Sequence, residues 1–466
     1  MASEEVLYLP VSELSRRIRQ RQLSPVKLTE TYLDRCRSIG PGLNAFVTLT
    51  PELAVTQARA AEKEITSGKY RGPLHGVPYA AKDLLAVKGY PTTWGARPYA
   101  NQTFTSDATI IRKLNEAGAI LLGKAAMIEL AGGMGYRYAS ASATGAARNP
   151  WNRDHWTCGS SSGSGAIMAA GLAAFALGTE TWGSIICPSG FCGISGLRPT
   201  YGRVSRYGAM ALSYSMDKIG PMCRTAADCD LVLRVISGHD SEDLGSLPES
   251  LAKYSGEEPG KAPLRVGWLI NQWKKVNPDV EHAVTTARQV LAASPEIKIS
   301  EVLLPEGPWE AAAGVIVSVE GAAAFRSLIH SGEVAELNDP VGKIGGYVNE
   351  EISAADFIAA QRIRSILQRK MDELFQQVDV LAAATLPVTA TNVEANLDQA
   401  LSFSDPIGGI GNFCGLPAVS VPCGFGDNGL PVGLQFIGRA LDDARVIAAA
   451  RLYQSRTDWH THHPKL

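Results

Sequence analysis

The chain carries two serines and a lysine in settings where they could form a nucleophile and its base. Ser160 lies in a run of glycines and serines, CGSSSGSG, Ser184 follows in the turn-like segment TWGSI, and Lys82 ends the apolar stretch VPYAAK. A serine hydroxyl needs a base to take its proton, and a neutral lysine serves as that base without any histidine. The combination predicts amide-bond hydrolysis by a serine enzyme outside the Ser-His-Asp class.

Lys82 acts as a base only in its neutral form. A free lysine has a pKa near ~10.4, and lowering it to about 7 requires roughly 4–5 kcal/mol of selective destabilisation of the charged form. Burial supplies shifts of that size, and apolar residues flank Lys82 on both sides, VPYAA before it and Leu84-Leu85 after it. The alternative is a surface lysine paired with Asp83.

The same run also fits a different serine enzyme. Gly159 to Gly163 matches the Gly-x-Ser-x-Gly pattern of a nucleophile elbow, which would make Ser161 the nucleophile. That fold needs an acid and then a histidine further along the chain. No downstream histidine has a distinctive setting, and the lysine arrangement is therefore favoured over these candidates: His239, His282, His330, His460, His462 and His463.

Two further motifs have simpler structural interpretations. The segment GAILLGKA at 118–125 imitates a phosphate-binding loop but lacks the final Ser or Thr that would hold magnesium, so a strand followed by a turn is expected. Asp240, Glu242 and Asp243 could bind a cation, but a solvated acidic loop is the more economical interpretation. We predict no metal and no cofactor.

Composition limits the class of protein and its partners. A net charge of −2 over 466 residues gives no long-range attraction to nucleic acid or anionic membranes. No segment approaches the ~20 apolar residues of a membrane-spanning helix, and the start MASEE lacks signal-peptide features. The eight cysteines are scattered without a Cys-x-x-Cys pair, so neither a disulfide framework nor a structural zinc site is expected. We predict a cytoplasmic protein with a small-molecule substrate.

Short apolar runs alternate with helical patterns along the chain, which predicts an α/β fold. Helices are expected over 11–19, 25–36, 51–67, 107–117, 163–173, 279–293 and 441–454. Strands are expected over 76–81, 119–122, 174–177, 264–270, 298–304 and 378–382, and Asp-Asn-Gly at 427–429 predicts a hairpin between 419–421 and 432–437. The stretch 239–262 has the weakest signal for order.

No linker is visible, so we predict one domain over residues 1–466. It divides into N-terminal helices (8–67), a catalytic core (72–238), a variable excursion (about 239–375) and a C-terminal part of the core (376–466). The helices within 8–40 are candidates for a homodimer contact, and a capping role explains them equally well.

The order of the segments resembles the amidase signature family over nearly the whole chain, most clearly over 72–238 and 403–454. The defining stretch contains GSSSGS (159–164), AAGL (169–172), LGT (177–179), GSI (183–185), FCG (191–193) and GLRPTYGRVS (196–205). Further matching blocks are GPLHGVP (72–78), RNPW (148–151), DKIGPM (217–222), GLPA (415–418) and PVGLQ (431–435). The resemblance implies a single large domain whose mixed, mainly parallel central sheet is covered by helices on both faces.

The resemblance also implies roles for the three residues. Ser184 would be the nucleophile, Lys82 the base, and Ser160 the bridging serine, which in the family follows a cis peptide bond. Ser160 would pass the proton from Ser184 to Lys82 and later to the leaving amine, and such assistance is worth ~10²–10⁴-fold. The backbone N–H groups of Thr181, Trp182, Gly183 and Ser184 would form the oxyanion hole.

The chain departs from the family pattern beside the nucleophile. Most members carry Asp-x-Gly-Gly-Ser-Ile-Arg, whereas this chain has ETWGSII. Trp182 replaces a glycine and is strained if the backbone there needs a positive φ. Ile186 replaces the arginine, so Glu180 is expected to lack its customary cationic neighbour. Cys158 and Ser162 also replace glycines. These changes predict an altered acyl pocket in which Trp182 favours aromatic or bulky substrates.

Other residues are candidates for substrate contact. Met134, Gly135 and Tyr136 lie where the family often contacts substrate, and together with Trp182 and Ile186 they form the predicted substrate-binding set. Packing in the core is an equally good explanation for Met134 and Tyr136.

The leading hypothesis is a stand-alone, metal-independent amidase that forms an acyl-enzyme on Ser184. Neutral amides are the expected substrates, and anilides, esters and carbamates (urethanes) are chemically accessible. One alternative is the catalytic subunit of an amidotransferase, which releases ammonia from glutamine for a partner protein. A second alternative is a non-catalytic relative that uses the fold as a binding scaffold.

Overall fold

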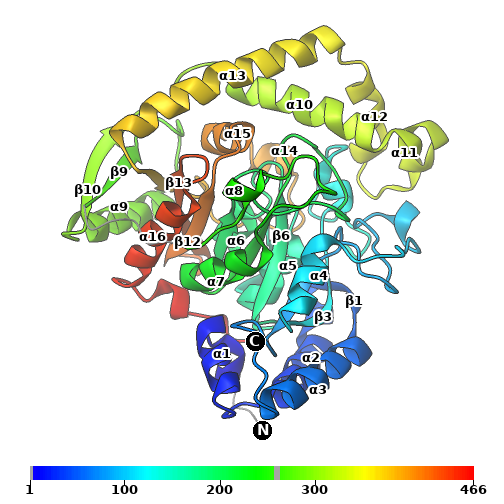
Figure 1. Cartoon of the computed structure of the whole chain (residues 1–466). Coiled ribbons are helices and arrows are strands. Elements are labelled where there is room, and N and C mark those ends of the chain that lie inside the picture. The colour runs from blue at the N-terminus through cyan, green and yellow to red at the C-terminus, as the bar shows by residue number, and fades with distance from the viewer. Residues whose placement is uncertain (1–3, 257–262) are drawn as a thin grey trace.

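One mixed sheet of eleven strands runs through the part of the chain that the computed structural model describes, residues 4–256 and 263–466 (Figure 1). The strand order is β1-β3-β2-β6-β8-β7-β12-β13-β11-β9-β10. Parallel pairs join β3, β2 and β6 on one flank and β11, β9 and β10 on the other. The remaining neighbours pair antiparallel. The strands of this sheet are β1 (Phe46–Leu49), β2 (Pro78–Lys82), β3 (Ile120–Ala125), β6 (Phe175–Glu180), β7 (Ser195–Arg198), β8 (Lys218–Cys223), β9 (Leu264–Leu269), β10 (Ile297–Val302), β11 (Val380–Ala384), β12 (Ala418–Phe425) and β13 (Pro431–Gly438).

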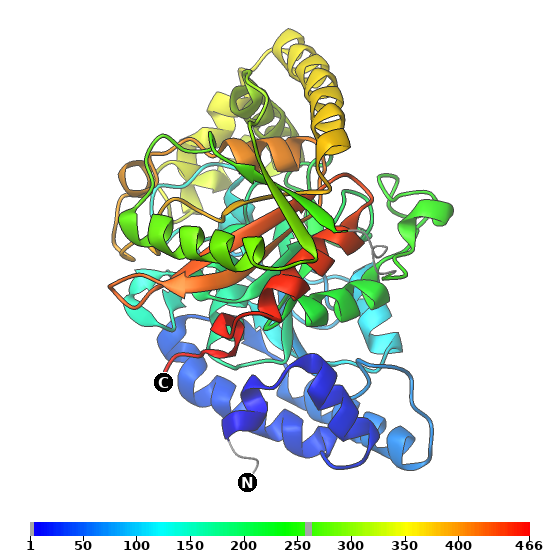
Figure 2. The same ribbon diagram turned by 90° about the vertical axis from the view of Figure 1, so that its left-hand side faces the viewer.

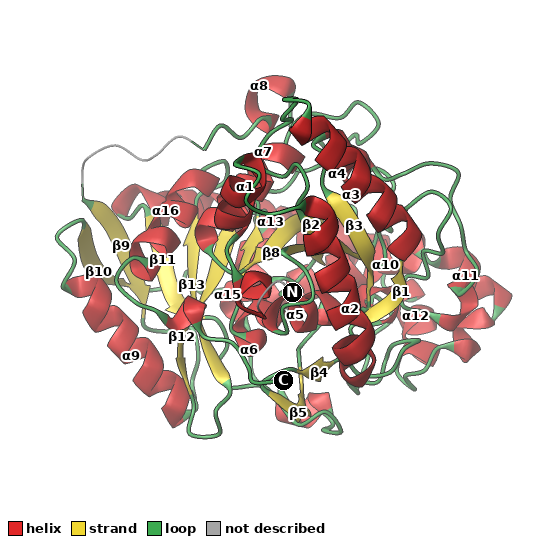
Figure 3. Ribbon diagram, turned by 90° about the horizontal axis from the view of Figure 1, so that it is seen from below, coloured by secondary structure: helices red, strands yellow, loops and turns green. Residues whose placement is uncertain are grey.

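Helices flank this sheet on both sides (Figure 3), and a separate small ribbon is formed by β4 (Arg148–Asn149) and β5 (Asn152–Trp156). The helices are α1 (Val11–Arg19), α2 (Pro25–Leu43), α3 (Pro51–Thr66), α4 (Thr109–Glu116), α5 (Ser162–Ala169), α6 (Ile186–Cys192), α7 (Ala226–Ile236), α8 (Glu249–Ala252), α9 (Pro278–Ala292), α10 (Trp309–Ala324), α11 (Arg326–Ser331), α12 (Gly342–Glu350), α13 (Ala354–Gln377), α14 (Leu397–Ala400), α15 (Pro406–Phe413) and α16 (Asp443–Gln454). Short 3₁₀ turns lie at Glu4–Tyr8, Arg97–Tyr99, Glu129–Gly132, Glu333–Glu336 and Trp459–Thr461. None of the described helices is long and apolar enough to cross a membrane.

The predicted fold class is confirmed: a single α/β domain is built around a mixed central sheet with helices on both faces. Of the ten neighbouring strand pairs in the described sheet, four are parallel and six are antiparallel. The N-terminal helices α1 to α3 lie at the opposite end of the molecule from α10 and α13 (Figures 1 and 2). The range 8–67 also contributes β1 to the sheet edge, and the range 239–375 contributes β9 and β10 to the opposite edge. Of the stretch 239–262, residues 257–262 lie outside the described residues, and the rest forms turns and α8.

Small residues allow α5 to pack deep inside the molecule. All of its residues are buried. A Cβ atom at Gly163 would lie 2.4 Å from the backbone nitrogen of Ala126, next to the end of β3, and one at Gly165 would lie 3.0 Å from the sulfur of Cys192 in α6. Side chains at these positions would therefore force α5 away from its neighbours. The glycines let the turn that carries Ser160 lie directly beside the strand ends.

One disulfide corrects the expectation drawn from the cysteine spacing. Cys158 and Cys187 are bonded, with their Cα atoms 6.0 Å apart and a separation of 29 residues in sequence. The other six cysteines are free and buried. The chain has no local Cys-x-x-Cys signal because the pair forms only when the segment before α5 packs against α6.

Candidate active site

Lys82 ends β2 with its side chain completely buried. Its Nζ atom donates to Ser160 Oγ at 2.7 Å and to Thr179 Oγ1 at 2.8 Å. Burial lowers the pKa of Lys82 to about 7, although the negative charges of Asp217 and Glu180 oppose the shift. A substantial fraction of Lys82 is therefore neutral near pH 7, as a proton-accepting base requires.

The neighbouring Asp83 has a different cationic partner, so the alternative of a surface Lys82–Asp83 pair is wrong. Asp83 Oδ1 lies 2.9 Å from Lys124 Nζ, and both side chains are fully buried. Its other oxygen accepts from the backbone N–H of Thr93 at 3.0 Å and from the Thr93 hydroxyl. Asp83 is the first residue after β2, and its bonds to Lys124 and Thr93 leave Lys82 to bond with Ser160 and Thr179. Lys124 lies in β3, which continues to Ala125, so the strand predicted over 119–122 is longer than expected and Lys124 does not lie in the predicted turn.

Ser160 is held at the entrance to α5. The bond between Gly159 and Ser160 is cis, as the family resemblance implies. The carbonyl of Ser160 accepts from the N–H of Ile128 at 3.2 Å. The turn is thus anchored to the segment that follows β3, while the hydroxyl of Ser160 faces Lys82.

Ser161 has a structural role, which weighs against the nucleophile-elbow alternative. Its hydroxyl donates to the carbonyl of Thr179 at 3.1 Å and accepts from the N–H of Thr179 at 3.2 Å. The next hydroxyl along the same face, Ser164, donates to the carbonyl of Leu177 at 2.9 Å. These bonds attach the start of α5 to β6. The hydroxyl of the fully buried Ser161 therefore already donates one hydrogen bond and accepts another.

Glu180 organises the turn that carries Ser184. One carboxylate oxygen accepts from the N–H groups of Ile185 at 2.8 Å and Ile186 at 2.9 Å. The other accepts from Arg198 Nη1 at 2.7 Å and from Asn412 Nδ2 at 2.9 Å. Burial raises the pKa of Glu180, but Arg198 and these hydrogen bonds outweigh it and lower the pKa overall. The prediction that Glu180 lacks a cationic neighbour is therefore wrong, because Arg198 in β7 supplies it.

Ser184 lies in the turn between β6 and α6, next to the Ser160 turn. Its carbonyl accepts from the N–H of Ser161 at 3.3 Å. Ser184 and Ser160 are almost completely buried, with exposed fractions of 7% and 2%. The fold thus brings the Lys82–Ser160 pair and the Ser184 turn together from separate parts of the chain.

The proposed oxyanion donors occupy an open turn. Within the described chain, no hydrogen bond links the backbone N–H groups of Thr181, Trp182, Gly183 or Ser184 to an acceptor. The positive φ of this turn, 78°, falls on Gly183, whereas Trp182 has no positive φ. The tryptophan is therefore free of the backbone strain considered from the sequence.

Trp182 extends toward α15. Its indole Nε1 donates to Asp405 Oδ2 at 3.1 Å, and its ring packs against Gly409, where an added Cβ would lie 3.0 Å from the ring. Burial raises the pKa of Asp405 to about 6, despite the hydrogen bonds from Gly408 and Trp182. The indole is thus held by a hydrogen bond from its nitrogen to Asp405 and by packing of its six-membered ring against Gly409.

The other predicted substrate-binding residues make packing contacts. Met134 is buried, with its sulfur facing Gly346 in α12. The ring of Tyr136 meets Trp156 edge to face at 6.2 Å, and Ile186 is buried in an apolar cluster under α15. Gly135 adopts a φ of 78°. Contact of these residues with substrate remains a prediction.

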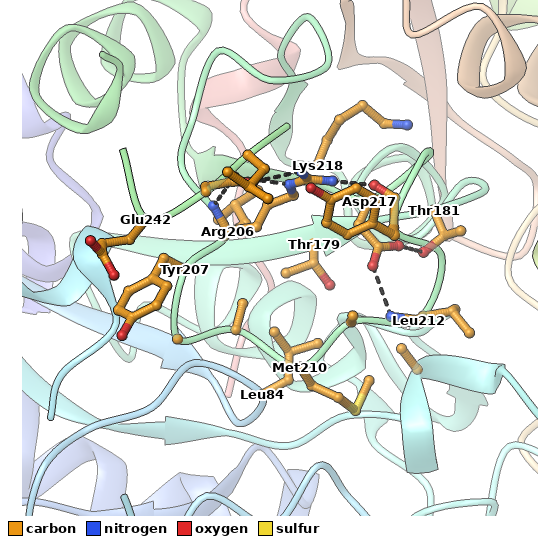
Figure 4. A pocket seen from close by; sticks show the side chains of 18 residues that line it. Leu84, Thr179, Thr181, Arg206, Tyr207, Met210, Leu212, Asp217, Lys218 and Glu242 are labelled. Atoms are coloured by element: carbon orange, nitrogen blue, oxygen red, sulfur yellow. Dashed lines mark hydrogen bonds and ion pairs between the residues drawn. The ribbon is translucent and has the colours of Figure 1, made fainter. Parts of the chain in front are cut away.

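A cavity of about 310 Å³ adjoins the site through Thr179 and Thr181 (Figure 4). Thr179 accepts from Lys82, and Thr181 donates to Asp217 at 2.5 Å. Much of the remaining wall is apolar, including Leu84, Met210 and Leu212. Sequence reasoning did not find Met210 and Leu212, which lie in a loop with no periodic pattern. The family-like block DKIGPM, which begins with Asp217, was the available signal for this wall.

Asp217 connects the cavity wall to the loop before β8. Its second carboxylate oxygen accepts from the N–H groups of Leu212 at 2.8 Å and Ser213 at 3.0 Å. Burial raises the pKa of Asp217, although these hydrogen bonds and the one from Thr181 oppose the shift. The carboxylate therefore ties the wall of the cavity to the segment that leads to Ser184.

Known proteins match this chain along almost its full length. A family model described as Amidase matches residues 27–447. The chain is 38% identical over 495 residues to a glutamyl-tRNA(Gln) amidotransferase subunit from Chloroflexus aggregans, covering 99% of each chain. It is 36% identical over 480 residues to the subunit of the same name from Acinetobacter baumannii, covering 97% of each chain.

Solved structures of related proteins have the same fold as this chain. The peptide amidase from Stenotrophomonas maltophilia matches with a TM-score of 0.83 and 30% identity over 96% of both chains. The corresponding glutamyl-tRNA(Gln) amidotransferase subunit from Thermotoga maritima matches with a TM-score of 0.82 and 28% identity, over 100% of this chain and 98% of that one. From the family model, the sequence identity and the shared fold, we conclude that the chain belongs to the amidase family of enzymes.

Proposed function

We propose that this protein hydrolyses amide C–N bonds through an acyl-enzyme on Ser184, with Ser160 as the proton relay and Lys82 as the base. The observation that carries the proposal is the 2.7 Å contact between Lys82 Nζ and Ser160 Oγ in a fully buried setting. Burial keeps part of the lysine neutral, and the open turn beside Ser184 supplies backbone donors.

The proposed cycle builds on the Lys82–Ser160 contact and on the backbone hydrogen bond that places the Ser184 turn beside the Ser160 turn. Neutral Lys82 takes the proton of Ser160 while Ser160 takes the proton of Ser184, and the Ser184 oxygen attacks the substrate carbonyl carbon. The N–H groups of the Thr181–Ser184 turn stabilise the oxyanion. Ser160 then delivers a proton to the departing nitrogen and recovers its own from Lys82. Water then attacks the acyl carbon while its proton passes through Ser160 to Lys82, and the proton returns through Ser160 to the Ser184 oxygen as the acid departs, which regenerates Ser184.

The proposed substrates are small molecules with a neutral amide. The cavity beside Thr179 and Thr181 has a largely apolar wall, which suits an uncharged group on the substrate. The fixed Trp182 adds an aromatic wall at the nucleophile turn. Anilides, esters and carbamates contain a carbonyl carbon open to the same attack and belong in the same test.

A second candidate is the catalytic subunit of an amidotransferase. Its support is the 38% identity over 99% of the chain to a protein named as a subunit of glutamyl-tRNA(Gln) amidotransferase. Glutamine would then be the preferred amide, and a partner protein would receive the ammonia. We favour the stand-alone hydrolase because Trp182 occupies a glycine position beside the proposed oxyanion donors. A homodimer through the N-terminal helices and a cytoplasmic location are parts of the same proposal.

A substrate panel tests these candidates. Alkyl amides, anilides, esters, carbamates and glutamine are offered to the wild type, Lys82→Ala and Ser184→Ala, with Ser162→Ala as a matched serine control. Hydrolysis lost in the first two variants and retained in the control supports the triad. Full turnover by Ser184→Ala refutes it. Glutamine as the sole substrate, with a second protein that co-purifies, selects the amidotransferase, and a Ser184 that resists fluorophosphonate labelling selects the scaffold.

A further inference from the structure

The disulfide lies between the two turns that carry the serines of the site. Cys158 is two residues before Ser160, and Cys187 is three residues after Ser184, in the first turn of α6. The loop closed by the disulfide therefore contains both serines. Cys187 is also hydrogen-bonded to the turn that carries Ser184, because its backbone N–H donates to the carbonyl of Gly183 at 2.7 Å.

Apart from the disulfide, the described residues join the two turns through one long backbone hydrogen bond and through packing of the helices that follow them, where a Cβ at Gly165 in α5 would lie 3.0 Å from the sulfur of Cys192 in α6. Ser160 is anchored to Lys82 and Ile128, whereas the Ser184 turn is anchored to Glu180. In the described residues, the backbone hydrogen bond between the turns is the long one from Ser161 N–H to the Ser184 carbonyl, at 3.3 Å. Ser161 also reaches β6, but it does so at Thr179, ahead of the nucleophile turn.

The backbone at Cys158 is a second observation. Its φ is 64°, in the left-handed region that favours glycine, and its side chain is 4% exposed. Cys187 is 9% exposed. A cysteine at a position that suits glycine, bonded to the helix that follows the nucleophile, is consistent with a need for the covalent link.

We propose that the Cys158–Cys187 disulfide positions Ser160 against Ser184, so that turnover depends on the oxidation state of this pair. The inference rests on the proposed function of the two serines. A small dithiol reductant would cleave the S–S bond by delivering two electrons and two protons, leaving two cysteine thiols and the cyclic disulfide of the reductant. Without the link the two turns shift relative to each other, and a displacement of ~1 Å in a catalytic group can lower the rate about 10²-fold.

The first test uses the wild-type protein prepared without reductant. Thiols counted after denaturation should number six, corresponding to the free cysteines, and should rise to eight after treatment with a dithiol. On the best substrate of the panel, kcat should fall about 10- to 100-fold as the two thiols appear, with KM changed less than about threefold. Reoxidation should restore kcat.

The second test uses variants. Cys158→Gly suits the local backbone and should reproduce the reduced enzyme, with a low kcat that no longer responds to reductant. Cys187→Ala and the double variant should show the same loss, because either change removes the whole link. Cys192→Ala is the matched control: this cysteine is free and buried at the end of the same helix, and the variant should keep the wild-type response to reductant.

Several results would overturn the inference. Eight thiols before reduction would show that the disulfide is absent, and an unchanged kcat after both thiols appear would show that it does not position the serines. A folded, fully active Cys158→Gly variant would do the same, even if reduction unfolds the wild type. Failure of the proposed function is distinguishable, because the oxidised wild type would then cleave no substrate of the panel while its thiol count stayed at six.

Discussion

Arg198 and Glu180 form a buried ion pair beside the turn that carries Ser184, with 2.7 Å between Nη1 and Oε1. The arginine comes from β7, and the carboxylate ends β6. The same carboxylate accepts hydrogen bonds from the N–H groups of Ile185 and Ile186. The ion pair therefore stabilises both the fold and the conformation of the turn that carries Ser184.

The first prediction concerns this pair. Arg198→Met should lower the free energy of unfolding by about 3–5 kcal/mol, because it leaves the Glu180 carboxylate buried without its charge partner. Urea unfolding measures this loss. Arg288→Met breaks the exposed pair with Glu301, whose side chains are 37% and 51% exposed, and should cost only about 0–1 kcal/mol. Equal losses in the two variants would contradict the assignment.

The second prediction concerns the pH dependence of hydrolysis. Lys82 must be neutral to accept a proton, and its pKa is about 7. The value of kcat/KM should therefore fall about tenfold for each pH unit below 7 and level off above it. A profile measured from about pH 5 to 9 shows the effect, with enzyme returned to about pH 8 as the control for irreversible loss. A rate that rises toward acidic pH would be incompatible with a lysine base.

The third prediction concerns stability. Because the pKa of Lys82 is about 7 in the folded protein, below its ordinary value of 10.5, the unfolded chain binds more protons between these values. Lys82 therefore destabilises the fold at neutral pH, and this cost fades as the pH rises toward 10.5. Lys82→Met should abolish hydrolysis and raise the free energy of unfolding at pH 7 by about 2–4 kcal/mol, after the loss of two hydrogen bonds. The difference between variant and wild type in urea should shrink at about pH 9.5, and a difference that grows with pH would contradict the burial argument.

The fourth prediction separates the neighbouring serines. Ser160→Ala should lower kcat by at least about 10²-fold, because it removes the relay between base and nucleophile. Ser161→Ala loses its bonds to Thr179 and should cost about 1–2 kcal/mol of stability while retaining most of the turnover. Kinetics and urea unfolding of both variants provide the comparison, and the opposite pattern would favour a nucleophile elbow at Ser161.

The fifth prediction concerns substrate choice. Trp182→Gly removes an indole fixed by Asp405 and Gly409. The ratio of kcat/KM for aryl over alkyl amides should fall about tenfold or more, since an aromatic wall is lost beside the nucleophile. Trp459→Gly alters a tryptophan in the C-terminal 3₁₀ turn and should leave the ratio unchanged. Unchanged kinetics of Trp182→Gly on both substrates would remove Trp182 from the specificity argument.

Helices and strands could be predicted where neighbouring residues along the chain carry the pattern. The amphipathic pattern of α1, the Ser24-Pro25 start of α2 and the Asp-Asn-Gly turn between β12 and β13 are features of neighbouring residues, and the structure has each of them. No helix was predicted over 309–377, where the structure has α10 to α13. α10 is rich in Ala, Gly and Val around its whole circumference, so its apolar pattern has no clear face.

The sequence by itself determined the α/β class, the local elements and the residues that match the amidase pattern, because these are written in short, ordered segments. Only the tertiary structure decided which groups meet: Arg198 with Glu180, Lys124 with Asp83, and Cys158 with Cys187. Each of these pairs joins segments that are separated along the chain and adjacent only after the sheet has assembled. The physical reason is that burial selects the partner of a charge or a thiol, and burial is a property of the whole packed molecule.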